Sequence, residues 1–195
     1  MKYFIIVLIA YLLGSFCASI PLSKRMYGGD VREKGSGNAG ATNMARVYGM
    51  KAGLATFALD AVKTVAAVLI GSYLGGAVGE ALAGAACIFG HCFPVYFAFH
   101  GGKGVSVGAA LGFMTGPWVF VIIMAVFFAV SFSTRKVSLG SMSAAVSLPI
   151  AAALTNAGKP MLLMCIFSAL LVIFMHRVNI KRLINGTESN FSAKK

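Results

Sequence analysis

Long apolar stretches recur along the whole chain, and they decide the solvent in which it folds. Each runs for about the twenty residues that a helix needs to cross a hydrocarbon core of roughly 30 Å. Of the 195 residues, 58% are hydrophobic and only 11% are charged, which excludes a water-soluble globular protein. The sequence therefore predicts an all-α, polytopic integral membrane protein with one transmembrane domain over residues 1–195.

The apolar stretches predict about seven transmembrane helices, one of them short. The N-terminal stretch is too long for the apolar region of a signal peptide, so we expect it to be retained as the first helix. Residues 105–116 fall short of a full span, and they form either a short crossing or a re-entrant turn; we expect the crossing. The predicted full-length spans cover residues 3–23, 53–74, 78–99, 118–133, 139–155 and 160–175.

The positions of lysine and arginine predict the orientation of these helices, because short cytoplasmic loops are enriched in both residues. With seven helices and the N-terminus outside, the inside loops contain nine of the 17 basic residues and the C-terminal tail contains five more. Only Lys2 and Lys159 lie outside, and Lys63 lies within a span. We therefore expect a cytoplasmic C-terminus, and the net charge of +12 needs no nucleic acid to explain it.

The first inside loop, at residues 35–46, combines glycine with polar residues. It reads GSGNAGATNMAR, which formally matches a dinucleotide-binding motif but lacks the strand and βαβ unit that such a motif requires. Glycines bring backbone N–H groups close to a ligand, and hydroxyls, amides and an arginine add hydrogen bonds and charge. An anion site would use Ser36, Gly37, Asn38, Thr42, Asn43 and Arg46. The alternative is a tight turn in which Asn43 caps the next helix.

The second inside loop, GHCFPVYFAFHGGKG at residues 90–104, places Lys103 where a helix is predicted to begin. An ammonium beside the N–H groups of a helix N-terminus forms an anion site. The loop is no Walker A motif, because a glycine follows the lysine where Ser or Thr is required. The candidates for ligand binding are Gly101, Gly102, Lys103 and Gly104, and the alternative for the glycines is a flexible loop.

His91 could contact the substrate, even as a base, or could be a hydrogen-bonded packing residue, and the sequence leaves both open. A zinc site built from Cys87, His91, Cys92 and His100 would have poor ligand spacing, so we expect no metal and no other cofactor. The cysteines, including Cys17 and Cys165, lie in apolar spans and are predicted to be small core residues.

Polar residues also follow the third loop and begin the tail. Ser138 and Ser141 open a predicted helix, where they either cap it or touch a ligand. His176 and Asn179 share one helical face that could close the site. Asp60 and Lys63, three residues apart within the second span, are interpreted as a structural ion pair.

Five segments together carry a resemblance to a known family. They are GSGNAGATNMAR at 35–46, LDAVK at 59–63, GHCFPVYFAFHGGKGV at 90–105, SLGS at 138–141 and HRVNIKRL at 176–183. In these segments, and over nearly its full length, the chain resembles the PlsY family of bacterial acyl-phosphate-dependent glycerol-3-phosphate acyltransferases. It departs from the family pattern at Ala39, Thr64, His100 and residues 106–107, none of which is a main polar candidate.

The resemblance implies an enzyme of phospholipid synthesis in the bacterial cytoplasmic membrane, with its active site facing the cytoplasm. It would move a fatty acyl group from acyl phosphate to the 1-hydroxyl of glycerol 3-phosphate, giving lysophosphatidic acid and phosphate. Its partners would be these two substrates and membrane lipid. By family analogy, Ser36, Arg46, His176 and Asn179 bind glycerol phosphate or position its hydroxyl, whereas Gly101, Gly102, Lys103 and Gly104 hold the acyl phosphate.

Direct transfer between the substrates is the mechanism that we expect, because the four cysteines lie in apolar spans with no basic partner at helical spacing and Ser36 lacks an adjacent base in the sequence. His91 or His176 acting as a general base is the competing mechanism. The competing function is a transporter or channel for an anion such as phosphate. Against it, no inverted repeat is visible and the polar residues cluster at one face rather than at the midplane.

Overall fold

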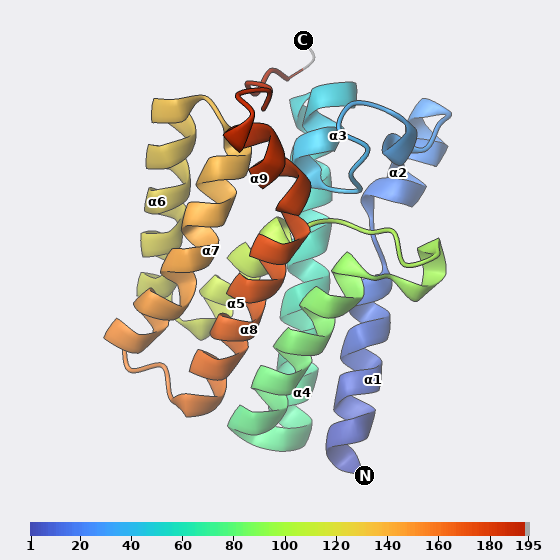
Figure 1. Cartoon of the computed structure of the whole chain (residues 1–195). Coiled ribbons are helices and arrows are strands. Elements are labelled where there is room, and N and C mark those ends of the chain that lie inside the picture. The colour runs from blue at the N-terminus through green and yellow to red at the C-terminus, as the bar shows by residue number, and fades with distance from the viewer. Residues whose placement is uncertain (194–195) are drawn as a thin grey trace.

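The computed structural model describes residues 1–193, and every regular element within them is a helix (Figure 1). This confirms the all-α prediction for the described residues. The longer helices pack side by side in a bundle: α1 (Lys2–Ser15), α4 (Met50–Cys92), α5 (Val105–Thr115), α6 (Pro117–Thr134), α7 (Val137–Leu154) and α8 (Lys159–Met175). Shorter helices connect or extend them: α2 (Ser19–Tyr27), η1 (Val31–Glu33), α3 (Ala41–Tyr48), η2 (Val95–Phe97) and α9 (Arg177–Ile184).

Helix α4 contains a reversal of the chain at Gly76. This glycine has φ 59° and ψ −153°, a backbone conformation that side chains strongly disfavour. The segments before and after it run side by side in opposite directions, and Gly79 packs directly on the backbone of Gly71 (Figure 1). The predicted boundary between residues 53–74 and 78–99 therefore coincides with a real turn.

The helices carry the apolar exterior of a protein that lies in a bilayer. By length and composition, four helical stretches within residues 1–193 are suited to cross a membrane, or five if α8 and α9 together form one bent span. Helix α5 is apolar but shorter, as predicted. Large apolar side chains project outward from several of these helices, among them Phe4, Val62, Leu69, Trp118, Phe132, Ile150 and Leu170.

The predicted first span, residues 3–23, lies within a helical stretch, Lys2–Tyr27, that is suited to cross a membrane, but this stretch is interrupted. Helix α1 ends at Ser15, Phe16 is extended, and α2 begins at Ser19 as a separate helix. Two carbonyls freed by the break, those of Gly14 and Phe16, accept hydrogen bonds from the Nζ atom of Lys63 at 3.1 and 2.8 Å. The apolar sequence pattern predicts that α1 continues and that these carbonyls accept helical hydrogen bonds. The buried ammonium of Lys63 takes the place of those donors.

Two further boundaries differ from the predictions. The predicted span 78–99 ends at Cys92, because Pro94 disfavours helical geometry in the residue before it. The tail helix is real, but the axis bends by 56° between α8 and α9, next to His176. Cys17 lies in the break after α1 rather than within a helix, although all four cysteines are buried and free, as core residues would be.

The packing brings the polar loops together. Helix α1 packs along α4, α6 along α7, and α3 along the first part of α4. Small residues at these contacts, such as Gly14 against the backbone of Cys87, let helices approach closely. The loops before α3 and between α6 and α7, together with α9, lie toward the end of the bundle opposite the N-terminus (Figure 1).

Candidate active site

A cavity of about 310 Å³ lies among these loops, and we call it the polar cavity. Its wall is formed by the loop before α3, by α3, the two ends of α4, the first turns of α5 and α7, part of α6, α9 and the chain that follows α9. Every non-glycine candidate from the sequence lines it: Ser36, Asn38, Thr42, Asn43, Arg46, His91, Lys103, Ser138, Ser141, His176 and Asn179. Residues separated by more than a hundred positions are thus brought into one site.

Asn43 organises the first loop from within α3. Its Oδ1 accepts a hydrogen bond from the backbone N–H of Ser36 at 2.9 Å. Its Nδ2 donates to the carbonyls of Val31, Lys34 and Asn38, each at 3.0 Å. The alternative that Asn43 caps the next helix is therefore wrong, because the cap residue is Gly40 and Asn43 is fully occupied in shaping the loop. Asn43 thus holds Ser36 at the cavity, and it precedes Arg46 by about one turn of α3.

Lys103 reaches from the second loop toward the tail helix. Its Nζ donates to Asn179 Oδ1 at 2.6 Å. Burial of its ammonium lowers the pKa of Lys103 to about 8; the nearby Glu188 opposes this change, and Arg182 and Arg46 add to it by repulsion. Three basic side chains, Arg46, Lys103 and Arg182, line this one cavity, and their positive charge would favour an anion there.

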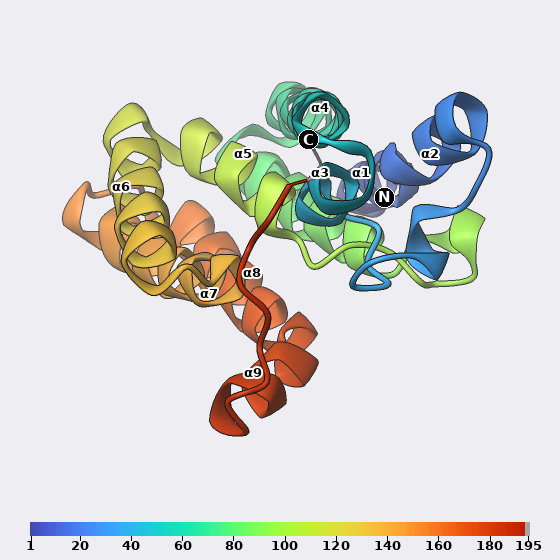
Figure 2. The ribbon, with the colours of Figure 1, turned by 90° about the horizontal axis from the view of Figure 1, so that it is seen from above.

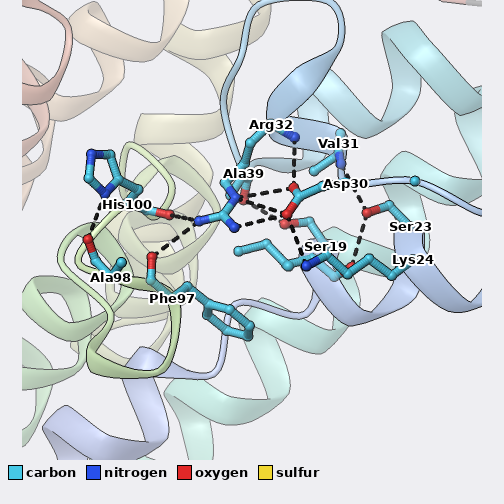
Figure 3. A network of polar contacts seen from close by, with 12 residues as sticks. Ser19, Ser23, Lys24, Asp30, Val31, Arg32, Ala39, Phe97, Ala98 and His100 are labelled. Carbon is cyan, nitrogen blue, oxygen red and sulfur yellow. Dashed lines mark hydrogen bonds and ion pairs between the residues drawn. The ribbon is translucent and has the colours of Figure 1, made fainter.

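Arg32 ties the first loop to the second (Figure 3). Its guanidinium binds Asp30 through Nε and Nη2, and its Nη1 donates to the carbonyls of Phe97 and His100, each at 3.1 Å. The hydrogen bonds from Arg32 lower the pKa of Asp30 to about 2, so this carboxylate stays charged. Arg32, held by Asp30, thus joins the second loop, which leads to Lys103, to the first loop, which leads to Ser36.

The chain after α9 crosses the cavity. Figure 2 shows it leaving α9 and running over the bundle toward α3 and α4. Glu188 anchors it: Oε1 accepts from Asn179 Nδ2 at 2.7 Å and from Ser138 Oγ at 2.5 Å, and the carbonyl accepts from Lys136 Nζ at 2.6 Å. Ser138 is therefore not a cap, and it joins α7 to the tail. Ser141 donates to the Val137 carbonyl one turn earlier, so it does not cap α7 either.

The two cavity histidines are fixed in opposite tautomers. His176 Nδ1 lies 2.8 Å from the carbonyl of Val172, which can only accept, so Nδ1 carries the proton and Nε2 has a free lone pair. His91 Nδ1 lies 3.0 Å from Lys63 Nζ, which can only donate when it is charged. The ion pair predicted between Asp60 and Lys63 is confirmed at 2.9 Å, and Ser106 Oγ donates to the other carboxylate oxygen at 2.7 Å.

The predicted glycines surround the polar cavity rather than line it. A Cβ added at Gly101 would overlap the carbonyl of His91, and one added at Gly102 would overlap its Nε2. The backbone N–H of Gly102 donates to that carbonyl at 3.0 Å. The second loop can thus pack directly on His91 because these two residues have no side chain. Close packing, rather than loop flexibility, explains the glycine at both positions. Gly37 lies at the loop surface, and Gly104 lines a neighbouring cleft.

This neighbouring cleft is almost entirely apolar, and we call it the apolar cleft. It lies between α5, α6, α7 and α8 and is lined by side chains such as Ile123, Ala145, Leu148 and Val172. Phe57, Val105, Met124, Phe127 and Ser141 line both it and the polar cavity. A molecule with an anionic head and an apolar tail could therefore occupy both at once.

Sequence reasoning missed several residues of the polar cavity, namely Ser106, Arg182, Glu188 and Ser189. Glu188 is one of only five acidic residues in the chain, so its rarity in a basic protein was the one available signal. Within residues 1–193, no group of three His, Cys, Asp or Glu side chains is placed to hold a metal ion.

Comparison with known proteins gives one consistent result. The family model for glycerol-3-phosphate acyltransferase matches residues 4–186. Relatives with that name include proteins from Thermoanaerobacter pseudethanolicus (42% identical over 96% of this chain and 94% of the relative) and Clostridioides difficile (40% identical over 100% and 98%). Crystal structures of PlsY, an integral membrane glycerol 3-phosphate acyltransferase, in its glycerol 3-phosphate and lysophosphatidic acid forms match with TM-scores of 0.92 and 0.90. Both are 34% identical, over 98% of this chain and 96% of theirs.

Proposed function

Because this chain belongs to the glycerol-3-phosphate acyltransferase family, we propose that its polar cavity transfers a fatty acyl group from acyl phosphate to the 1-hydroxyl of glycerol 3-phosphate. The products are lysophosphatidic acid and inorganic phosphate, in phospholipid synthesis. The observation that carries this assignment is the junction of a cationic cavity with an apolar cleft through shared wall residues. The donor has a phosphate head and a long apolar tail, and this junction suits both parts.

Two phosphate groups must be accommodated at once, and the cationic side chains of the polar cavity suit them. In this proposal Arg46 and Ser36 bind glycerol 3-phosphate from the first loop, while Lys103 binds the acyl phosphate with the N–H groups that begin α5. His176 and Asn179 position the acceptor hydroxyl. Thr42, Asn38 and Ser138 add polar contacts around these groups, and Ser141 lies at the entrance to the apolar cleft.

Direct transfer is the mechanism that the arrangement supports. The hydroxyl oxygen of glycerol 3-phosphate attacks the acyl carbonyl carbon, the bond from this carbon to the phosphate oxygen breaks, and the hydroxyl proton passes to the departing phosphate. Asp30 and Asp60 are held by Arg32 and Lys63, so neither orients a histidine toward a serine. The protein supplies position and positive charge rather than a nucleophile.

The decisive experiment uses the purified protein in detergent with acyl phosphate and glycerol 3-phosphate. We expect lysophosphatidic acid and phosphate in equal amounts, because transfer forms one ester for each phosphate released. Mass spectrometry of protein quenched after exposure to acyl phosphate alone should show no acyl adduct. An anion transporter would form no ester, and a stoichiometric adduct at Ser36 or at a cysteine would contradict direct transfer.

We propose further that the helices cross the bacterial cytoplasmic membrane seven times, with the N-terminus outside and the polar cavity facing the cytoplasm. The reversal at Gly76 supports two crossings within α4. The loop before α3, the loop between α6 and α7, and α9 lie toward one end of the bundle, which is the charge distribution expected of cytoplasmic segments (Figure 1).

Single cysteines test this topology. Glu33→Cys lies in an exposed part of the first loop, whereas Thr155→Cys lies exposed between α7 and α8 at the opposite end. In intact cells an impermeant thiol reagent should label Thr155→Cys and not Glu33→Cys, and after cell lysis it should label both. The wild-type protein is the control, because its own cysteines are buried. Labelling of Glu33→Cys in intact cells would show that the orientation is inverted.

A further inference from the structure

A buried charged group holds His91 at the floor of the polar cavity. Lys63 and His91 lie on the two antiparallel limbs of α4, and both side chains are almost fully buried. Four atoms surround the Lys63 ammonium within 3.1 Å, namely Gly14 O, Phe16 O, Asp60 Oδ1 and His91 Nδ1. The two carbonyls and His91 Nδ1 match the three N–H donors of a charged lysine, provided that Nδ1 presents its lone pair, and Asp60 Oδ1 adds an ion pair.

This geometry decides the tautomer of His91. A proton on Nδ1 would point at the ammonium, and the nearest carboxylate oxygen, Asp60 Oδ1, is farther from Nδ1, at 3.6 Å. The neutral ring therefore carries its proton on Nε2. In such a ring Nε2 has no lone pair with which to accept a proton, and a second proton on Nδ1 would make the ring a cation beside Lys63. His91 is accordingly a hydrogen-bond donor and not a general base.

The Nε2 donor faces the place where a ligand would lie. His91 is 1% exposed and lines the polar cavity, yet its Nε2 makes no hydrogen bond with any residue between 1 and 193. Nε2 is not among the fully buried unpartnered side-chain atoms, so a ligand in the polar cavity can reach it and supply the acceptor. Gly102, which lies directly against Nε2, has no side chain to cover it.

We propose that the Nε2–H of His91 donates a hydrogen bond to an oxygen of the bound acyl phosphate, and that Lys63 is the positioning residue that maintains this tautomer. The inference rests on the proposed function. Acyl phosphate is favoured over glycerol 3-phosphate because His91 packs against the second loop, whose next residues, Gly104 and Val105, line the apolar cleft. In this arrangement the phosphate head of the acyl phosphate lies next to the point where its acyl tail enters the apolar cleft.

Two substitutions of similar size separate this role from a structural one. The amide of Asn at position 91 reaches about as far as Nδ1 and can still accept from Lys63, but it offers no donor at the Nε2 position. The amide of Gln reaches about as far as Nε2 and can restore that donor. We expect His91→Asn to lower kcat/KM for acyl phosphate by about tenfold, with KM for glycerol 3-phosphate little changed, and His91→Gln to recover most of the loss.

A structural role predicts the opposite order, with Asn tolerated better than Gln, and that result would overturn the proposal. Thermal unfolding of both variants shows whether they fold. The tautomer is tested separately on the wild-type protein by nitrogen-15 NMR of its histidines, where His91 should show a protonated Nε2 and an unprotonated Nδ1. A protonated Nδ1 would overturn the proposal without any assay. Failure of the wild-type enzyme to form lysophosphatidic acid would instead refute the proposed function on which the inference rests.

Discussion

Replacing Lys103 by alanine should lower kcat/KM for acyl phosphate by about tenfold to a hundredfold, with little change in the temperature of unfolding. Charge-assisted hydrogen bonds are worth about 1.5–3 kcal/mol, and the loss of one that acts on the transition state appears fully in the rate. Initial rates with purified protein provide the measurement. Arg46→Ala should show a loss of similar size for glycerol 3-phosphate, since its guanidinium lines the same cavity.

Lys159→Ala is the matched control, because Lys159 is exposed and begins α8 at the end of the bundle away from the polar cavity. It should retain wild-type activity. Full activity of Lys103→Ala would remove this residue from the site. A large fall in unfolding temperature would instead show that its hydrogen bond to Asn179 serves the fold.

The pH dependence provides a second measurement on the same residue. The pKa of Lys103 is lowered to about 8, so its ammonium is present below that pH and is lost as the pH rises through it. In the wild-type enzyme kcat/KM should therefore fall above about pH 8, since this parameter reports the free enzyme. Lys103→Arg should lose this alkaline decline whatever its absolute rate, because a guanidinium stays charged. An unchanged decline in the arginine variant would assign it to another group.

Replacing Gly102 by alanine should lower kcat/KM by about a hundredfold. The added Cβ would overlap His91 Nε2, and His91 cannot yield easily because its Nδ1 is held by Lys63. The second loop must therefore shift, and Lys103 shifts with it. A displacement of about 1 Å at a reacting group is enough for a loss of this size. Steady-state kinetics for both substrates provide the measurement.

Gly116→Ala is the matched control for Gly102→Ala. Gly116 lies between α5 and α6, outside the linings of the polar cavity and the apolar cleft, and a Cβ added there would meet Val119 Cγ2 at an ordinary contact distance of 3.9 Å. This variant should therefore keep wild-type activity. If Gly102→Ala were as active as Gly116→Ala, the close packing of the second loop on His91 would have no part in catalysis.

The sequence by itself determined the class of fold and most of the helix boundaries. In a bilayer, an apolar run of spanning length forms a helix, because each of its backbone polar groups must find a hydrogen-bond partner within the same segment. The predicted spans 118–133, 139–155 and 160–175 therefore agree with α6, α7 and α8 to within two residues at either end. Motif chemistry likewise singled out Ser36, Arg46, Lys103, His176 and Asn179, which all line one cavity.

Only the tertiary structure decided how these residues are oriented. The break after Ser15 depends on Lys63, and the tautomer of His91 depends on the same ammonium, 28 positions away. Glu188 closes over the cavity through partners on α7 and α9. Hydropathy and motif spacing describe what each segment prefers locally, whereas a buried polar atom takes whichever partner the packing of distant segments brings within reach.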